Sequence, residues 1–519
     1  MTPTPRVASL CLLALGFIWV IQSGPVASQS KLVRFYEPGD LRPTLAADGR
    51  SPILAGLNNS LTASGANLPE DWIVVAVPEG TRLAAVRAVA ETVDRRSFPG
   101  TEGAGTAPWA ELAGSGYLRG QRLEHIRVRP VRGETAGELE VARRLRLELD
   151  LEPDSEAPLS VRPVRWPGED SFSRAVHRIA PGLAPDPTRR NLLVNGGEAF
   201  SPSFIQSEDG SAVRYLSITT DHLATEFERF AAWKTATGMP AVVRTLSWIE
   251  ANYPQGVDRA ADIRAFIQTA VANWGVEYVL LGGDSGLLPP RYAKTYFYGG
   301  ENIPSDMYFA CLDGTWNGDG DERFGEGYLN QGIPGDGADL YPDVWVGRLP
   351  LATPAGVSGW VDKSIHYETG VPLGVGFGSE VLSLAEMLFP QNWTQGDTVI
   401  FDGADVSETA MSYLPGHITP TRLYENHTAF PGALPETFAN VVAEINAGHN
   451  LVLHVGHGFT NTMAVGVGGL TLGNADADGF TNANQGVLYA INCTSSAFDF
   501  DCIAEHFLRN PNGGFVASV

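Results

Sequence analysis

Two residues with reactive side chains each follow a predicted buried strand. Residues 450–455 form an apolar run that ends just before His457, and residues 486–492 form another that ends at Cys493. Short apolar runs bounded by glycines indicate strands buried in a parallel sheet. Because the carboxyl ends of parallel strands lie at one edge of a sheet, we expect the imidazole and the thiol to meet there.

A thiol beside an imidazole is suited to acyl transfer. The imidazole takes the proton from the sulfur, and the thiolate then attacks a carbonyl carbon. The protonated imidazole afterwards gives the proton to the leaving amine. The backbone amides of Gly458 and Cys493 are candidates for stabilising the oxyanion that forms. From spacing alone two other interpretations stay open: His457 as a turn residue between glycines, and Cys493 as a small core residue.

The cysteine count excludes a disulfide-dense scaffold. Four cysteines are present, and Cys11 falls in the apolar N-terminal segment. If that segment is removed, three cysteines remain, which leaves at least one thiol unpaired within the chain. An unpaired thiol in an exported protein agrees with a catalytic cysteine, although a buried inert cysteine also fits.

The N-terminus is predicted to be a signal peptide covering residues 1–28. Arg6 supplies the positive charge, residues 10–21 form the apolar segment, and small residues follow up to Ser28. The apolar run is short for a membrane span, although an uncleaved anchor stays an alternative. We therefore expect a protein that is secreted or held at the cell surface, with no stable membrane span once the signal is cleaved.

A linker divides the rest of the chain. Residues 29–190 are predicted to be a mostly β domain, because stretches such as 125–131 alternate polar and apolar residues. A segment rich in proline and glycine then runs to about residue 213 and contains the dibasic pair Arg189-Arg190. Such a segment fits either proteolytic processing or an ordinary interdomain loop.

Residues 214–519 alternate between strand and helix patterns. The stretches 215–219 and 241–243 are typical of buried strands, and residues 223–236 between them carry apolar side chains at helical spacing. This order predicts an α/β domain in which a mainly parallel sheet is flanked by helices. The apolar run at 515–519 ends where the chain ends, so we expect a fragment of a longer protein, truncated at its C-terminus.

The net charge limits the kinds of molecule that the protein is expected to bind. The formal net charge is −23, which argues against nucleic-acid binding because that function needs basic surfaces. A negative field favours cationic substrates, but solubility and acidic metal-binding loops explain the same charge.

Several blocks of the C-terminal half, in their order along the chain, resemble the gingipain family of cysteine peptidases. The blocks nearest the reactive residues are His454-Val455-Gly456-His457-Gly458, Asn492-Cys493-Thr494 and Asp501-Cys502-Ile503-Ala504-Glu505. Supporting blocks lie at residues 215–221, 232–234, 280–284, 305–308 and 342–350. The match runs from about residue 213 to 519, and the preceding β domain resembles the propeptide of the family.

The resemblance implies a caspase-like α/β fold and a cysteine endopeptidase made as a zymogen. It implies Cys493 as nucleophile, His457 as its partner, and Asp343 as an acid near the histidine that orients it; a solvent-facing role for Asp343 is the alternative. Cys502 matches a second, non-nucleophilic cysteine. The expected partners are protein or peptide substrates and the chain's own propeptide, and no catalytic cofactor is implied.

An acidic, glycine-rich loop suggests a structural calcium ion. Its candidate ligands are Asp313, Asn317, Asp319 and Asp321, with Glu322 and Glu326 close by. Hard cations prefer such clusters of oxygen ligands, although the spacing is not that of an EF-hand. Residues 474–482 are a second candidate, and a solvated turn is the alternative for each loop. The resemblance favours calcium at the first loop.

Two other functions are compatible with the sequence. One is an exported binding or adhesion protein whose peptidase-like domain is inactive. The other is a metallohydrolase that uses His454, His457 and Cys493, although this set is short of a usual zinc site. The position of His454, further back along its strand, favours a core or subsite residue.

Overall fold

The computed structural model describes most of the chain beyond the N-terminal segment. The described residues are 31–36, 44–45, 52–53, 58–61, 67–77, 81–97, 108–118, 121–135, 138–154, 212–294, 302–326, 336–338, 340–370, 376–466 and 469–519. The predicted signal peptide and the dibasic pair of the linker lie outside them. In the described part no helix has the length and apolar character that a membrane span requires.

The N-terminal region is built of antiparallel strands, as the alternating sequence pattern predicted. In β10, Leu145, Leu147 and Leu149 are fully buried on one face, and charged residues lie between them. One sheet contains β1 (Lys31–Tyr36), β10 (Glu138–Pro153), β6 (Thr81–Ser97) and β9 (Val131–Thr135). A second contains β4 (Asn58–Leu61), β5 (Asn67–Ala76), β8 (Gln121–Val128) and β7 (Ala110–Leu118), and β2 (Thr44–Leu45) pairs with β3 (Pro52–Ile53).

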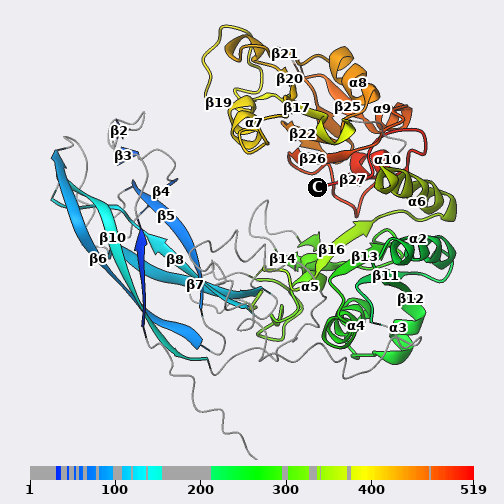
Figure 1. Ribbon diagram of the computed structural model, residues 1–519, viewed down its shortest axis with the longest axis horizontal. Helices are drawn as coiled ribbons and strands as arrows, with labels where there is room; N and C mark the ends of the chain where they lie inside the picture. Colours follow the sequence, from blue (N-terminus) through cyan, green and yellow to red (C-terminus); the bar gives the residue numbers. More distant parts are fainter. Residues whose placement is uncertain are drawn as a thin grey trace, which may run out of the picture. The chain divides into compact units, whose positions relative to one another are not determined.

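The first parallel sheet follows the linker. Its order is β12 (Ala241–Thr245), β11 (Tyr215–Thr219), β13 (Tyr278–Gly282) and β16 (Trp345–Leu349). The accompanying helices are α2 (Ala224–Ala236), α3 (Leu246–Asn252), α4 (Arg259–Trp274), α5 (Met307–Ala310) and α6 (Pro354–Thr369), and β14 (Arg291–Lys294) pairs with β15 (Asn302–Ser305). In Figure 1 this sheet and helices α2 to α5 are green to yellow-green, and α6 is olive.

The second parallel sheet carries both reactive residues. Its order is β21 (Leu434–Pro435), β20 (Thr421–Tyr424), β17 (Val381–Ala385), β22 (Leu451–Val455), β26 (Val487–Ile491) and β27 (Ala517–Ser518). Its helices are α7 (Gly403–Met411), α8 (Phe438–Ala447), α9 (Asn474–Gly479) and α10 (Ile503–Arg509). The short strands beside it are β18 (Met387–Phe389), β19 (Phe401–Asp402), β23 (Gly458–Phe459), β24 (Thr462–Ala464) and β25 (Thr471–Gly473).

Local sequence signals explain the element that leads into β22. The side chain of Thr437 accepts a hydrogen bond from the backbone amide of Asn440 and so caps the N-terminus of α8. Gly448 follows the last helical residue with φ of 87°, a conformation that glycine adopts at little cost. The predicted strand at 450–455 is confirmed to within one residue.

The predicted α/β class is confirmed, and the parallel strands are divided between two sheets. Each sheet has its own core, one centred on residues such as Phe266 and Leu281 and the other on residues such as Leu384 and Phe507. A further apolar cluster joins α2 and α6 to Leu508 of α10. The division matters for the site, because only residues on the second sheet share an edge with β22.

The chain forms two compact units. One unit comprises Met1–Ile73, Thr81–Ala113 and Ile126–Asp154, and the other comprises Val74–Gly80, Gly114–His125 and Ser155–Val519. In the second unit Leu118 and Leu123 are buried in a cluster against which Tyr341 and Trp345 pack. Two short segments of the predicted propeptide region therefore belong to the same compact unit as the α/β domain.

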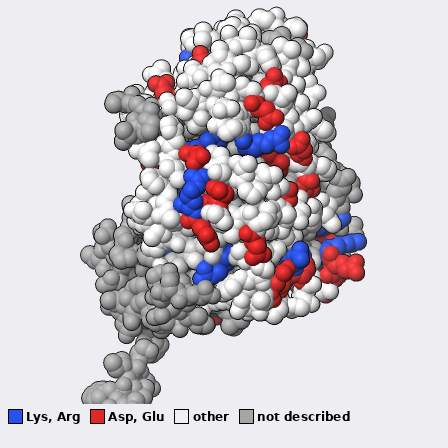
Figure 2. Space-filling view, turned by 90° about the vertical axis from the view of Figure 1, so that its right-hand side faces the viewer, with Lys and Arg blue, Asp and Glu red and all other residues white. Residues whose placement is uncertain are grey.

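The face of the molecule shown in Figure 2 is not dominated by one sign of charge. Acidic and basic side chains alternate across it, and neither kind gathers into a broad patch. Ion pairs occur within the second unit, such as that of Arg229 of α2 with Asp362 of α6.

Candidate active site

His457 and Cys493 lie at corresponding positions beyond two neighbouring strands. Strands β22 and β26 are parallel, and their last paired residues are Val455 and Ile491. Each reactive residue comes two positions later, so both leave the sheet at the same edge. The amide of Gly456 donates a hydrogen bond of 3.2 Å to the Ile491 carbonyl, which continues the pairing toward this edge. Cys493 is exposed to solvent.

Three contacts hold His457. Its backbone amide donates to Glu386 Oε2 at 2.7 Å, and its Nε2 is 3.1 Å from the carbonyl oxygen of Leu388. A carbonyl only accepts hydrogen bonds, so Nε2 is the nitrogen that carries the proton in this contact. The ring of Phe389 meets the imidazole edge-on, with centroids 6.3 Å apart. In the neutral imidazole Nδ1 is therefore free to accept a proton.

Glu386 belongs to a row of three buried glutamates. Glu386, Glu425 and Glu436 each follow the last residue of a parallel strand, and the register of β17, β20 and β21 places them side by side. Their exposed fractions are 4%, 6% and 0%. Burial raises the pKa of Glu386 to about 7 and raises the pKa of both neighbours, because ionising a carboxyl out of water is unfavourable.

The sequence analysis did not identify Glu386. The only local signal is an acidic residue that directly follows the apolar run at residues 381–385. Its position next to His457 depends on the pairing of β17 with β22, in which Ala385 lies opposite Val455.

The glycines on either side of His457 are required by close contacts. A Cβ at Gly456 would lie 2.6 Å from Glu386 Oε2 and 2.8 Å from His454 Nε2. A Cβ at Gly458 would lie 2.8 Å from the side-chain carbon Cγ of Asn492. Real Cβ atoms do not approach other atoms this closely, so larger residues would displace the neighbouring side chains.

The three cysteines in the described residues have different environments. Cys493 is exposed, whereas Cys311 and Cys502 are buried. Burial raises the pKa of the Cys502 thiol to about 11, so it stays protonated near neutral pH. Of these thiols, only Cys493 is open to a substrate.

Comparison with known proteins identifies the family of this chain. The model of peptidase family C25 matches residues 208–519, which is more than half of the chain. The chain belongs to peptidase family C25. Gingipain R2 of Porphyromonas gingivalis is 23% identical over 306 residues, covering 58% of this chain and 35% of the relative. Gingipain R1 of the same organism is 23% identical over the same length, covering 26% of the relative. The chain thus spans about a third or less of these relatives.

Solved structures of gingipains also match this C25 chain. The crystal structure of the Arg-specific cysteine proteinase gingipain R is 21% identical, covers 61% of this chain and 64% of that chain, and has a TM-score of 0.43. A complex of the pro- and mature domains of RgpB from P. gingivalis is 20% identical, covers 59% of this chain and 63% of that chain, and has the same TM-score.

In this C25 domain Asp343 is buried beside the first parallel sheet. Asp343 lies just before β16, in the first parallel sheet, and is 2% exposed. Its Oδ2 accepts a hydrogen bond of 2.7 Å from the amide of Leu312. The carboxylate in contact with His457 is that of Glu386, on the second sheet. Asp343 thus lies beside a strand of the first sheet and His457 beyond a strand of the second, and the expected role of Asp343 in orienting the histidine stays a prediction.

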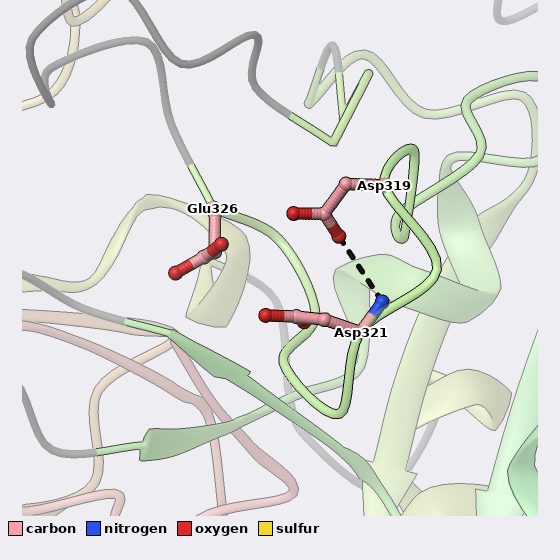
Figure 3. A group of neighbouring side chains, drawn as sticks. All are labelled: Asp319, Asp321 and Glu326. Carbon is pink, nitrogen blue, oxygen red and sulfur yellow. Dashed lines mark hydrogen bonds between the residues drawn. The ribbon is translucent and has the colours of Figure 1, made fainter.

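The acidic loop of the C25 domain brings three carboxylates together. Oxygens of Asp319, Asp321 and Glu326 lie within 4.8 Å of one another, and Figure 3 shows their side chains grouped at one loop. The Asn317 amide donates to the Asp321 carbonyl at 2.7 Å and so holds the loop in shape. Asp313, a predicted ligand, is not part of this group in the described residues.

The second acidic stretch has other roles. Asp476 accepts a hydrogen bond of 2.8 Å from the amide of Gly473 at the start of α9. Asp478 forms ion pairs with His506 and Arg509 of α10. The carboxylates of Asp476 and Asp478 therefore both have protein groups as partners.

Proposed function

We propose that this chain is the zymogen of a secreted cysteine endopeptidase that uses a Cys493–His457 dyad. One observation carries the proposal: the two residues stand two positions beyond the paired ends of adjacent parallel strands. Membership of family C25 supports the same reaction. The exposed thiol and the available Nδ1 of His457 supply the two groups that the chemistry needs.

The reaction proceeds in two stages. His457 Nδ1 takes the thiol proton, and the sulfur attacks the carbonyl carbon of the peptide bond. The backbone amides of Gly458 and Cys493 donate hydrogen bonds to the oxyanion that forms. The imidazolium then protonates the leaving amine, and the C–N bond breaks to leave a thioester. Water, deprotonated by His457, hydrolyses the thioester and restores the thiol.

Glu386 and Leu388 position the histidine in this scheme. The Glu386 carboxyl holds the His457 backbone, and the Leu388 carbonyl holds Nε2, so the ring has one defined orientation and tautomer. Such preorganisation matters because small misplacements of reacting groups lower rates strongly.

The N-terminal region acts as the chain's own propeptide in this proposal. Tyr341 and Trp345 pack against Leu118 and Leu123. This packing supports a non-covalent association between the N-terminal region and the α/β domain that persists after the linker is cleaved. The signal peptide directs the protein to the outside of the cell or its surface, where proteins or peptides are the substrates.

A calcium ion at Asp319, Asp321 and Glu326 is the structural part of the proposal. Three carboxylates at this separation fit a hard cation that prefers oxygen ligands. The buried Asp336 holds the backbone of this loop, because its carboxylate accepts hydrogen bonds from the amides of Gly318 and Glu326.

Cleavage of a peptide library by the processed protein tests the catalytic assignment. Cys493→Ala is expected to lose activity by at least about a thousandfold, since no other group replaces the nucleophile. Cys502→Ala is the matched control, because it removes a buried thiol on the same segment and leaves the chemistry in place. Full activity in a clean Cys493→Ala preparation would end the proposal, and an inert wild-type protein that binds peptides would favour a binding function.

A further inference from the structure

A buried histidine lies directly behind the candidate site. His454 is fully buried, and its Nε2 is 2.8 Å from the carbonyl oxygen of Ala464. The carbonyl accepts, so Nε2 carries the proton and Nδ1 is left as an acceptor. Asn492 Nδ2 lies 3.5 Å from that Nδ1 and is its donor. Burial lowers the pKa of His454 to about 4, so the imidazole is neutral and keeps this pattern at neutral pH.

Asn492 connects this histidine to both loops of the site. Its Oδ1 accepts a hydrogen bond of 2.7 Å from the hydroxyl of Ser495, which closes the turn that contains Cys493. The same side chain packs against Gly458, where a Cβ would lie 2.8 Å from Asn492 Cγ. The amide group of Asn492 therefore lies between the residue after His457 and the turn of the thiol.

The turn is also tied to the element that follows it. Ser495 is 3% exposed, and its carbonyl accepts a hydrogen bond of 3.2 Å from the amide of Ala504 in α10. His454 and Ser495, the two ends of the His454–Asn492–Ser495 chain, are buried, so water does not replace a partner lost there and a distortion is passed on to the turn.

We propose that His454 is a positioning residue, which acts through Asn492 to hold the Cys493 turn and the Gly458 amide at a fixed separation. His454 does not touch the substrate. It aligns the Asn492 carboxamide, which in turn fixes where the thiol stands relative to the backbone donor for the oxyanion. The inference rests on the proposed Cys493–His457 chemistry.

The test compares two buried histidines of the same region. His454→Phe removes both hydrogen bonds at similar volume, and Asn492→Leu removes the carboxamide. His454→Gln is the conservative variant, because its amide has both a donor for Ala464 and an acceptor for Asn492. His449→Phe is the matched control: His449 is 5% exposed and bonds Glu444, but it lies before β22, whereas His454 is the penultimate residue of that strand.

Three measurements separate positioning from simple stability: kcat and KM on a peptide substrate, the pH dependence of alkylation of Cys493, and the melting temperature. For His454→Phe and Asn492→Leu we expect kcat to fall about 10- to 100-fold with KM little changed. Alkylation at neutral pH should slow, since a displaced thiol is less well deprotonated by His457. His454→Gln should recover most of the rate, and the double variant should be no worse than the poorer single variant.

The opposite pattern would overturn the inference. If His454→Phe keeps kcat and alkylation within about twofold of wild type while losing stability like His449→Phe, the residue only fills the core. Failure of the proposed function looks different, because Cys493→Ala would then keep the activity whatever happens at His454.

Discussion

The backbone amide of His457 donates a 2.7 Å hydrogen bond to the carboxyl of Glu386, a residue 71 positions earlier in the chain. Glu386 directly follows β17, and the pairing of β17 with β22 brings the two residues together at the sheet edge. This contact connects the stability of the sheet edge to pH, because the carboxyl involved is almost fully buried.

The variant Glu386→Gln tests that connection. Burial raises the pKa of Glu386 to about 7, so from about pH 4.5 to 7 the carboxyl ionises in the unfolded chain while it stays protonated in the folded one. The free energy of unfolding of the wild type should therefore fall as pH rises through this window, by up to about 3 kcal/mol. Urea unfolding at several pH values should show a flatter profile for Glu386→Gln.

The exposed Glu380, six residues earlier, provides the control. Glu380→Gln should keep the wild-type dependence on pH. An unchanged slope in Glu386→Gln would show that this carboxyl is not the group that titrates.

Gly456→Ala should displace side chains that surround His457. The added methyl group would lie 2.6 Å from Glu386 Oε2 and 2.8 Å from His454 Nε2, so one of these side chains must move. We expect a loss of about 1–3 kcal/mol in the free energy of unfolding and a large fall in kcat. Gly416→Ala is the control, because a Cβ there meets nothing within 4 Å. Equal effects of the two substitutions would contradict the predicted crowding.

Lys363 is expected to stabilise the C-terminal end of the α/β domain. Its buried Nζ donates to the carbonyls of Phe507, Gly513 and Phe515 at 3.0, 3.2 and 3.0 Å. Lys363→Met leaves these acceptors without that donor and should lower the free energy of unfolding by about 1–3 kcal/mol at pH 7.

The pH dependence of Lys363 has a defined sign. Burial lowers its pKa to about 7, so between about pH 10 and 7 the unfolded lysine takes up a proton before the folded one does. The wild type should lose stability as pH falls through this range, and Lys363→Met should not. Urea denaturation at pH 7 and at pH 10 measures the free energy of unfolding of the wild type and of Lys363→Met. If the difference between the two proteins is the same at both pH values, Lys363 does not titrate as proposed.

Calcium should raise the melting temperature through the acidic loop. In the wild type we expect a concentration-dependent upward shift on addition of calcium, because an ion that binds only the folded state stabilises it. Asp319→Asn and Asp321→Asn should each reduce the shift, since they remove a charged ligand. Glu322→Gln, a neighbouring exposed acid outside the cluster, should retain it. A shift that survives in both Asp variants would place the ion elsewhere.

Local sequence patterns predicted the strands that precede His457 and Cys493. The apolar run at 450–455 and the one at 486–492 were predicted to be buried strands, and the structure has β22 and β26 at these positions. Only β22 is buried as predicted, because Tyr489 and Ile491 of β26 are exposed. Cys502 is buried and Cys493 is exposed, and the expected roles of the two thiols stay predictions. The proposal that Cys493 and His457 form a dyad stays a prediction until activity is measured.

The sequence by itself determined which segments become strands and helices and which residues have reactive groups, because apolar periodicity, caps and glycines act over a few residues. Only the tertiary structure decided which strands are neighbours. It placed Asp343 on one sheet and Glu386 beside His457 on another, and it aligned three glutamates from three separate strands. Strand pairing joins residues that are far apart in the chain, and local sequence patterns contain no information about the partner that each strand will have.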